Sequence, residues 1–265
     1  QRNNIPSADF FLVEKREQIA KYADFFPFFQ KLRKGGYDGK GVCKLAALNQ
    51  IEKAFDQPSV LERLVDYEKE LSVIVARSEN GEISAFPVVE CEFNPSANLV
   101  EFLFSPAEIK KSVEKEAVAI AKKVAEKLNI VGLLAVELFL TKDGKILVNE
   151  IAPRPHNSGH QTIEGNITSQ FEQLWRAILN LPLGDTSICK ASVMINLLGE
   201  FGFEGPAVYK GMEDVLKFSG VYVHLYGKYE TKPFRKMGHA TIVDNDLLKA
   251  RKKALIVKEL LKVIA

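Results

Sequence analysis

The segment from Val148 to His160, V-N-E-I-A-P-R-P-H-N-S-G-H, holds the densest group of side chains in the sequence that could bind or transform a substrate. Its two prolines restrict the backbone on both sides of Arg154. His156 and further hydrogen-bonding side chains follow immediately. So many donors and acceptors on a stiff loop predict a site for an anion or a polar substrate.

The two histidines of this loop, His156 and His160, are four residues apart, as zinc ligands on a helix can be. Gly159 and the prolines disfavour a helix here, and no H-E-x-x-H pattern is present. The pattern therefore favours anion or substrate binding over a zinc site.

Two glutamates, Glu137 and Glu150, lie on the predicted strands of one hairpin. If Leu140 pairs with Lys145, Glu137 lies opposite Val148, so both carboxylates share one face. They would repel each other unless a cation lay between them, and Mg²⁺ bridging ATP phosphates would meet that need. Alternatively, Glu137 pairs with a cation or faces solvent, and the register differs by one.

The loop G-G-Y-D-G-K-G at 35–41 is rich in glycine and carries Lys40. Its backbone amides could approach a polyphosphate closely, while the lysine adds positive charge. It is not a Walker A loop, because Gly41 follows the G-K pair where Ser or Thr is required. Composition alone is equally compatible with a surface turn.

Four cations need an explanation. Lys31 ends an apolar strand, from which its ammonium group either reaches solvent or enters a cleft. Lys228, Arg235 and Lys236 surround a predicted hairpin near the C-terminus. That group is either a solvent-facing turn or a clamp for a phosphate.

The elements that must position these side chains follow an α+β pattern. Asn80-Gly81 predicts a hairpin turn, and the residues from 107 to 128 predict an amphipathic helix capped by Ser105 with Pro106 at its first position. The other predicted strands are 10–13, 27–32, one near 42, 70–77, 82–90, 131–140 and 145–150, and the other helices are 15–24, 167–180 and 245–264.

Composition restricts the class of protein. The chain has 265 residues, of which 46% are hydrophobic and 26% charged, as in an ordinary globular protein. With 36 basic and 34 acidic residues, it has no excess of positive charge typical of nucleic-acid binding. Three widely spaced cysteines favour a reducing cytoplasm, and no run of about 18 apolar residues predicts a membrane span.

Several motifs occur together in one order. N-E-I-A-P-R-P-H-N-S-G-H at 149–160, T-S-Q-F-E-Q at 168–173, the glycine loop at 35–41 and H-L-Y-G-K…R-K-M-G-H at 224–239 resemble the N5-carboxyaminoimidazole ribonucleotide synthetase family of ATP-grasp enzymes. The resemblance implies an ATP-grasp fold, in which two α+β subdomains grip ATP. These would be residues 1–75 and 76–182, followed by a small β-rich unit at 183–265.

The resemblance also implies roles for individual residues. Arg154 and His156 would face bicarbonate or carboxyphosphate, Lys228 and Arg235 would hold the phosphate of 5-aminoimidazole ribonucleotide, and Glu137 and Glu150 would bind Mg²⁺, or Mn²⁺ in its place. Tyr37 and Asp38 would also lie near the ribonucleotide, Glu62 to Val65 would line the adenine, and Glu70 would bind the ribose. The full set of implied nucleotide-binding residues is Lys31, Gly36, Tyr37, Asp38, Gly39, Lys40, Gly41, Val42, Glu62, Arg63, Leu64, Val65, Glu70, Asn149 and Glu150.

The implied reaction uses ATP to phosphorylate bicarbonate and transfers the carboxyl unit to the amine of 5-aminoimidazole ribonucleotide. Two departures from the family are expected to matter. Phe93 stands where relatives usually carry a histidine. The chain also starts after the Rossmann-like N-terminal domain of the family, which would contribute to ribonucleotide binding and to the homodimer. The alternatives are another ATP-grasp ligase, of the formate or biotin type, and a non-catalytic nucleotide-binding module.

Overall fold

The computed structural model describes residues 2–36, 41–94 and 99–265. The chain divides into two compact units. Unit 1 comprises Gln1–Glu68 and Phe139–Asn149, and unit 2 comprises Lys69–Leu138 and Glu150–Ala265. Helices and strands are mixed in the chain, which confirms the predicted α+β class. The division at residues 75 and 182 stays a prediction.

Unit 1 contains a four-stranded antiparallel sheet in the order β1-β4-β2-β3. Its core includes Phe28, Leu45 and Leu61, and the buried Gln30 points to the same side as Phe28. Side chains alternate along a strand, so Lys31 projects from the opposite face of the sheet. The elements are β1 (Phe10–Val13), η1 (Arg16–Phe25), β2 (Phe28–Leu32), β3 (Val42–Leu45), η2 (Leu48–Lys53) and β4 (Ser59–Arg63).

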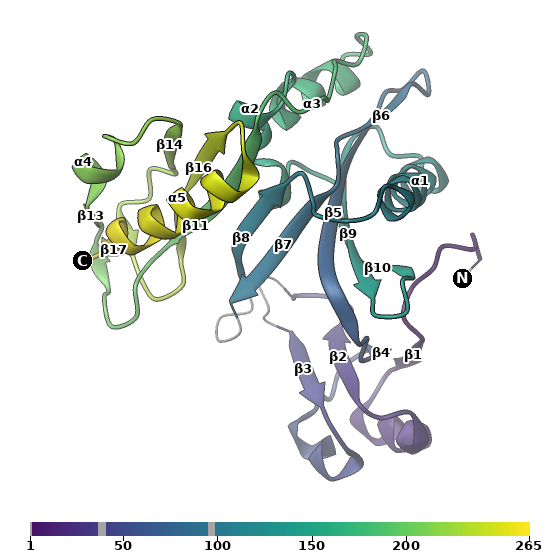
Figure 1. The fold of residues 1–265 in the computed structure, drawn as a ribbon. Coiled ribbons are helices and arrows are strands. Elements are labelled where there is room, and N and C mark those ends of the chain that lie inside the picture. The colour runs from purple at the N-terminus through teal and green to yellow at the C-terminus, as the bar shows by residue number, and fades with distance from the viewer. Residues whose placement is uncertain (1, 37–40, 95–98) are drawn as a thin grey trace. The chain divides into compact units, whose positions relative to one another are not determined.

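A nine-stranded sheet runs in the order β10-β9-β5-β7-β8-β11-β16-β14, with β6 paired to β5 (Figure 1). In unit 2, helix α5 (Leu247–Leu260) lies across β11 and β16 and covers a core that includes Val193, Ile242 and Val257. The strands are β5 (Tyr67–Arg77), β6 (Ile83–Ala85), β7 (Val89–Asn94), β8 (Leu99–Ser105), β9 (Gly132–Thr141), β10 (Ile146–Ala152), β11 (Ala191–Leu198), β14 (Val221–Leu225) and β16 (Lys236–Asp244).

The remaining elements of unit 2 are short, apart from α1 and α3. Helix α3 begins after Ser169, whose side chain accepts a hydrogen bond from the Glu172 N–H as an N-cap. These elements are α1 (Lys111–Lys127), η3 (Asn157–Gly159), α2 (Thr162–Gly165), α3 (Gln170–Ile178), β12 (Gly205–Pro206), β13 (Val208–Lys210), α4 (Met212–Val215), β15 (Glu230–Thr231) and β17 (Lys262–Ile264).

The Asn80-Gly81 turn is confirmed. The Ser78 N–H donates to the Glu82 carbonyl at 2.9 Å, and Gly81 has a φ of 91°. Antiparallel pairing of Arg77 with Ile83 follows directly. Glycine adopts this left-handed conformation without strain, which is why the dipeptide is a reliable turn signal.

Two helix ends differ from the prediction. Ser105 does not cap α1, because it ends β8 and pairs there with Ser192, so the helix begins only at Lys111. The C-terminal helix ends at Leu260, and Lys262–Ile264 forms β17, which pairs with β13. In both places pairing with a distant strand overrides the local preference for helix.

The register of the hairpin between β9 and β10 also differs from the one assumed. The Thr141 N–H donates to the Lys145 carbonyl at 2.9 Å, and Gly144 closes the turn with a φ of 82°. Thr141, and not Leu140, is therefore opposite Lys145. The assumed pairing of Leu140 with Lys145 is therefore wrong. The argument that it places Glu137 and Glu150 on one face of the hairpin no longer applies.

Candidate functional site

A polar cluster in unit 1, the Lys31 cluster, comprises Lys31, Glu62 and Asn149. Glu62 pairs across the sheet with Phe29, two residues before Lys31, so the alternation of β-strands places both charged side chains on one face. The Lys31 ammonium forms an ion pair with Glu62 and donates to Asn149 Oδ1 at 3.1 Å. The side chains of Lys31 and Glu62 are 32% and 16% exposed. The structure thus brings together three of the predicted nucleotide-binding residues.

The glycine loop is described only at its two ends. The Leu32 N–H donates to the Gly41 carbonyl at 2.9 Å, and a Cβ at Gly41 would lie 3.0 Å from the Gly36 Cα. Gly41 therefore allows the two ends of the loop to approach closely, and Val42 begins β3 immediately after it. The predictions for Tyr37, Asp38, Gly39 and Lys40 lie outside the described residues.

The segment predicted to line the adenine begins at Glu62, near the end of β4. The Arg63 N–H donates to the Asp9 carbonyl at 2.9 Å, and the Leu64 N–H donates to the Pro27 carbonyl at 3.1 Å. These bonds tie the backbone of Arg63 and Leu64 to other segments of unit 1. Their effect on adenine binding stays a prediction.

An acidic group surrounds Cys91 in unit 2. Glu70 on β5 pairs directly with Cys91 on β7. Burial raises the pKa of the Cys91 thiol well above its ordinary value, and the negative charges of Glu137, Glu70 and Glu90 raise it further. The structure therefore brings the predicted ribose ligand Glu70 and the predicted metal ligand Glu137 near one buried thiol. Phe93 lies two residues further along β7.

The donor chemistry of Glu137 and Glu150 fits a hard divalent cation, which prefers carboxylate oxygens. The negative charge around Cys91 is the kind of environment that a cation would offset. Glu150 is exposed. Within residues 2–36, 41–94 and 99–265, however, no three His, Cys, Asp or Glu side chains already form a metal-binding group.

His156 is held by hydrogen bonds on one side of its ring. Its Nδ1 accepts the Ser158 N–H as a helix N-cap and lies 2.8 Å from Ser158 Oγ, which in turn is 2.7 Å from Ser72 Oγ. A neutral ring that accepts at Nδ1 carries its proton on Nε2. That Nε2 lies 3.6 Å from Glu137 Oε1.

The electrostatic environment keeps His156 neutral at pH 7. Burial lowers its pKa to about 4, and the positive charges of Arg154 and Lys236 contribute to the shift. Arg154 itself is exposed and donates from Nη1 to the Pro155 carbonyl at 3.1 Å. The loop therefore presents a permanent cation next to a neutral imidazole, and both sequence-predicted residues lie in one place.

The other three histidines form a second group, the histidine cluster: His160, His224 and His239. His224 and His239 are cross-strand partners in β14 and β16, with ring centroids 4.5 Å apart. The His160 ring also stacks with the His239 ring, with centroids 4.7 Å apart. Burial lowers the pKa to about 4 for His160 and about 3 for His239, so these two rings are neutral at pH 7.

Polar groups surround the histidine cluster. Glu164 Oε1 lies 2.7 Å from His224 Nε2, and the Tyr226 hydroxyl lies 3.0 Å from His239 Nδ1. Gln170 Nε2 lies 3.0 Å from His160 Nδ1. The motifs quoted from the sequence contained all three histidines and Gln170, but spacing gave no sign that these segments meet. The sequence interpretation missed this cluster.

The two predicted phosphate-binding cations of unit 2 flank a turn. The Lys228 ammonium donates to the Lys236 carbonyl and lies 5.7 Å from the Tyr226 ring centroid. The Arg235 guanidinium donates to the Glu230 carbonyl at 2.8 Å. Both contacts are made to backbone carbonyl oxygens, and the assignment of the two cations to a phosphate stays a prediction.

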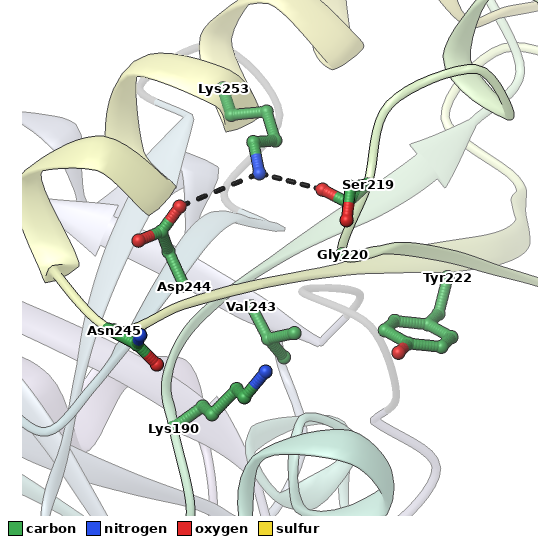
Figure 2. A pocket seen from close by; sticks show the side chains of 8 residues that line it. All are labelled: Lys190, Ser219, Gly220, Tyr222, Val243, Asp244, Asn245 and Lys253. Atoms are coloured by element: carbon green, nitrogen blue, oxygen red, sulfur yellow. Dashed lines mark hydrogen bonds and ion pairs between the residues drawn. The ribbon is translucent and has the colours of Figure 1, made fainter.

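A hollow of about 200 Å³ lies elsewhere in unit 2 (Figure 2). Lys253 points into it, donates to the Ser219 carbonyl at 2.7 Å and forms an ion pair with Asp244 at 3.6 Å. None of the site residues predicted from the sequence lines it. The residues around it are Lys190, Ser219, Gly220, Tyr222, Val243, Asp244, Asn245 and Lys253.

Comparison with known proteins identifies the class. The ATP-grasp domain model matches residues 1–171, and the model of the phosphoribosylaminoimidazole carboxylase C-terminal domain matches residues 192–253. The chain belongs to the ATP-grasp family. In the part of the chain that the structure describes, no helix is long and apolar enough to cross a membrane.

Individual relatives narrow the family further. The N5-carboxyaminoimidazole ribonucleotide synthase of Bacillus subtilis is 47% identical over 222 residues, which are 82% of this chain and 56% of the relative. The crystal structure of the N5-carboxyaminoimidazole ribonucleotide synthetase from Thermotoga maritima is 47% identical, with a TM-score of 0.90 over 100% of this chain and 69% of that one. Within the ATP-grasp family, the chain therefore groups with the N5-carboxyaminoimidazole ribonucleotide synthetases.

A third relative has been crystallised with small molecules. The synthase from Aspergillus clavatus, in complex with ADP and 5-aminoimidazole ribonucleotide, is 28% identical, with a TM-score of 0.86 over 97% of this chain and 70% of that one. The chain spans just over half the length of the curated bacterial relatives from Bacillus subtilis and Synechococcus elongatus, at 56% and 55%.

Proposed function

We propose that this chain supplies the ATP-grasp part of an enzyme that carboxylates 5-aminoimidazole ribonucleotide with bicarbonate and ATP. The products are N5-carboxyaminoimidazole ribonucleotide, ADP and phosphate, in purine biosynthesis. The observation that carries the proposal is the loop from Arg154 to Ser158, which sets a guanidinium beside a neutral imidazole whose Nε2 faces the Glu137 carboxylate. The names of the relatives supply the substrate class.

The nucleotide would be held by the Lys31 cluster and the loop from Gly36 to Val42. The Lys31 ammonium already sits between two oxygen acceptors, Glu62 and Asn149, and the approach of a phosphate would replace or share these contacts. Glu137 and Glu150 would hold Mg²⁺, or Mn²⁺, in unit 2. When bound, the cation would offset negative charge on the phosphates of ATP.

The reaction proceeds in three steps. A bicarbonate oxygen attacks the γ-phosphorus of ATP, and ADP leaves, which gives carboxyphosphate. Carboxyphosphate then splits into carbon dioxide and phosphate. The exocyclic amine of the ribonucleotide attacks the carbon of carbon dioxide, forms the new C–N bond and loses a proton.

The residues of the 154–158 loop are suited to the first two steps. Arg154 offers planar, charge-assisted hydrogen bonds to a phosphate or carboxylate group. His156 carries its proton on Nε2 and stays uncharged at pH 7, so it can donate a hydrogen bond to an anionic oxygen. Lys228 and Arg235 would bind the phosphate of the ribonucleotide. We also propose that the enzyme acts as a homodimer in the cytoplasm.

The test is an ATP hydrolysis assay on the purified chain and on any longer form that its gene encodes. We expect hydrolysis that requires both bicarbonate and 5-aminoimidazole ribonucleotide. Formate in place of bicarbonate should give no turnover. Hydrolysis that is supported by formate, or ATP binding without any turnover in the longer form, would contradict the proposal.

Arg154→Ala provides a sharper test within the same assay. Ligation should fall by a factor of about a thousand, while the Kd for ATP stays within about threefold, because Arg154 is assigned to carboxyphosphate and not to adenine. Isothermal titration with ATP and single-turnover measurements separate the two quantities. A large loss of ATP affinity would remove Arg154 from this role.

A further inference from the structure

Gln170, the first residue of α3, has its side chain entirely buried in unit 2. Its Oε1 accepts the His156 N–H at 3.0 Å, and its Nε2 donates to the His156 carbonyl at 2.9 Å. The Gln170 amide therefore binds both the backbone N–H and the backbone carbonyl of His156. The second Nε2 hydrogen is left for His160 Nδ1, at 3.0 Å.

These contacts fix the orientation of the Gln170 amide. If the amide were rotated by half a turn, its oxygen would face the His156 carbonyl and its NH₂ group would face the His156 N–H, and both pairs would repel. The NH₂ group can only donate. His160 Nδ1 must therefore be the acceptor, and the proton of the neutral ring is on Nε2.

We infer that Gln170 is a positioning residue that orients the His156 peptide and sets the tautomer of His160. Its catalytic consequence rests on the proposed function, because His156 is assigned there to the bicarbonate site. The consequence for the His160 tautomer follows from the hydrogen bonds alone. The inference therefore has two parts that can fail separately.

The surroundings leave the amide little room to move. A Cβ at Gly159 would lie 2.5 Å from Gln170 Oε1, so the amide packs directly on the loop backbone. The Gln170 N–H donates to Thr162 Oγ1 at 2.8 Å, and Thr162 donates onward to the Gly159 carbonyl. The loop from His156 to Gly159 is thus tied to the first turn of α3 by backbone and side chain together.

The same helix carries a matched control. Gln173 is also entirely buried and accepts the Gly184 N–H at 2.8 Å while donating to the Gly184 carbonyl at 3.1 Å. The geometry repeats that of Gln170 on His156, but the residue that is held is a glycine outside the predicted site. A substitution at Gln173 therefore measures the loss of stability when such a pair of hydrogen bonds is broken, with no direct effect on His156 or His160.

The first measurement needs no substitution. The full chain, labelled with ¹⁵N-histidine, is examined by long-range ¹H–¹⁵N NMR at pH 7, and the four histidines are assigned with single His variants. We expect His160 to show a protonated Nε2 and an unprotonated Nδ1. A protonated Nδ1 in the unmodified chain would overturn the inference.

The second measurement compares Gln170→Glu with Gln173→Glu. A carboxylate at position 170 can only accept a hydrogen bond, so it would favour the His160 tautomer that is protonated on Nδ1 and would repel the His156 carbonyl, and the His160 signals should change. In the ligation assay kcat should fall about tenfold or more, with the KM for ATP within about threefold. Both variants should lower the melting temperature by a similar amount. Gln173→Glu, however, should leave the His160 signals and kcat unchanged.

The outcomes separate the two hypotheses. If neither the unmodified chain nor its longer form shows turnover but His160 has the expected tautomer, the proposed function fails and the assignment of Gln170 to His160 stands. If Gln173→Glu changes the His160 signals and kcat as much as Gln170→Glu does, Gln170 has only a structural role and the inference is wrong. Should either Glu variant not fold, Gln170→Met and Gln173→Met replace the pair with the same expectations for kcat.

Discussion

The two polar clusters of this protein handle burial in opposite ways. In unit 1, the Lys31 cluster contains an ion pair, and the side chain of its lysine is 32% exposed. In unit 2, the histidine cluster is built of stacked rings around His239, which is 3% exposed and kept neutral by burial. Partial hydration tolerates an ion pair, whereas full burial favours neutral groups that are satisfied by hydrogen bonds. The difference is consistent with the two tasks proposed above, attraction of a charged nucleotide in unit 1 and orientation of the 154–158 loop in unit 2.

The first prediction removes the charge from the Lys31 cluster. Lys31→Met should weaken ATP binding on the order of a hundredfold, because charge-assisted hydrogen bonds to a phosphate are strong. It should also reduce the dependence of the Kd on KCl concentration, since salt screens exposed charges. Titration calorimetry at several salt concentrations measures both effects.

Arg33→Met is the control for this prediction. Arg33 lies two residues from Lys31 and forms an exposed ion pair with Glu14 at 2.8 Å. Its loss should leave ATP affinity unchanged within about twofold, because surface ion pairs contribute little. Equal losses for both variants would mean that general positive charge, and not the Lys31 cluster, binds ATP.

The second prediction concerns the pH dependence of stability in the histidine cluster. The pKa of His239 is lowered to about 3, from an ordinary 6.5, first by burial and then by His160 and His224. Between these values the unfolded chain binds a proton that the folded chain does not, so the free energy of unfolding falls as pH falls from 6.5 toward 3. Above 6.5 the contribution is fully present.

His239→Gln isolates that contribution. Glutamine is of similar size and can accept the Tyr226 hydroxyl, but it does not titrate. Between pH 7 and pH 5, urea unfolding should show a loss of stability that is smaller by about 2 kcal/mol in the variant than in the unmodified chain. Parallel pH profiles for the two chains would show that His239 is not the responsible group.

The third prediction perturbs the packing of the Gln170 amide. The methyl group of Gly159→Ala would strike Gln170, whereas that of Gly184→Ala would strike the Thr168 side chain. Each should cost about 1 to 2 kcal/mol in chemical denaturation. Only Gly159→Ala should alter the His160 NMR signals, and a change of these signals in Gly184→Ala would contradict the separation between the two positions.

The sequence predicted the side of the sheet on which the Lys31 cluster lies and one of the tight turns. The period of two along a strand already places Lys31 opposite the core side of β2, and Asn80-Gly81 specifies its turn. Motifs in order placed Arg154 and His156 in one loop. The register of the hairpin that carries Glu137 was not predictable to within one residue, because Gly144 allowed a three-residue turn as readily as a two-residue one.

The sequence by itself determined the α+β class, the family resemblance and the chemical character of the 148–160 loop. Only the tertiary structure decided where α1 begins and where α5 ends, since Ser105 and Lys262 enter strands paired with distant partners. It alone brought His160, His224 and His239 into one stack and set Gln170 against His156. Strand alternation and turn chemistry act between neighbours in sequence, whereas burial and hydrogen-bond direction depend on segments that meet only in the folded chain.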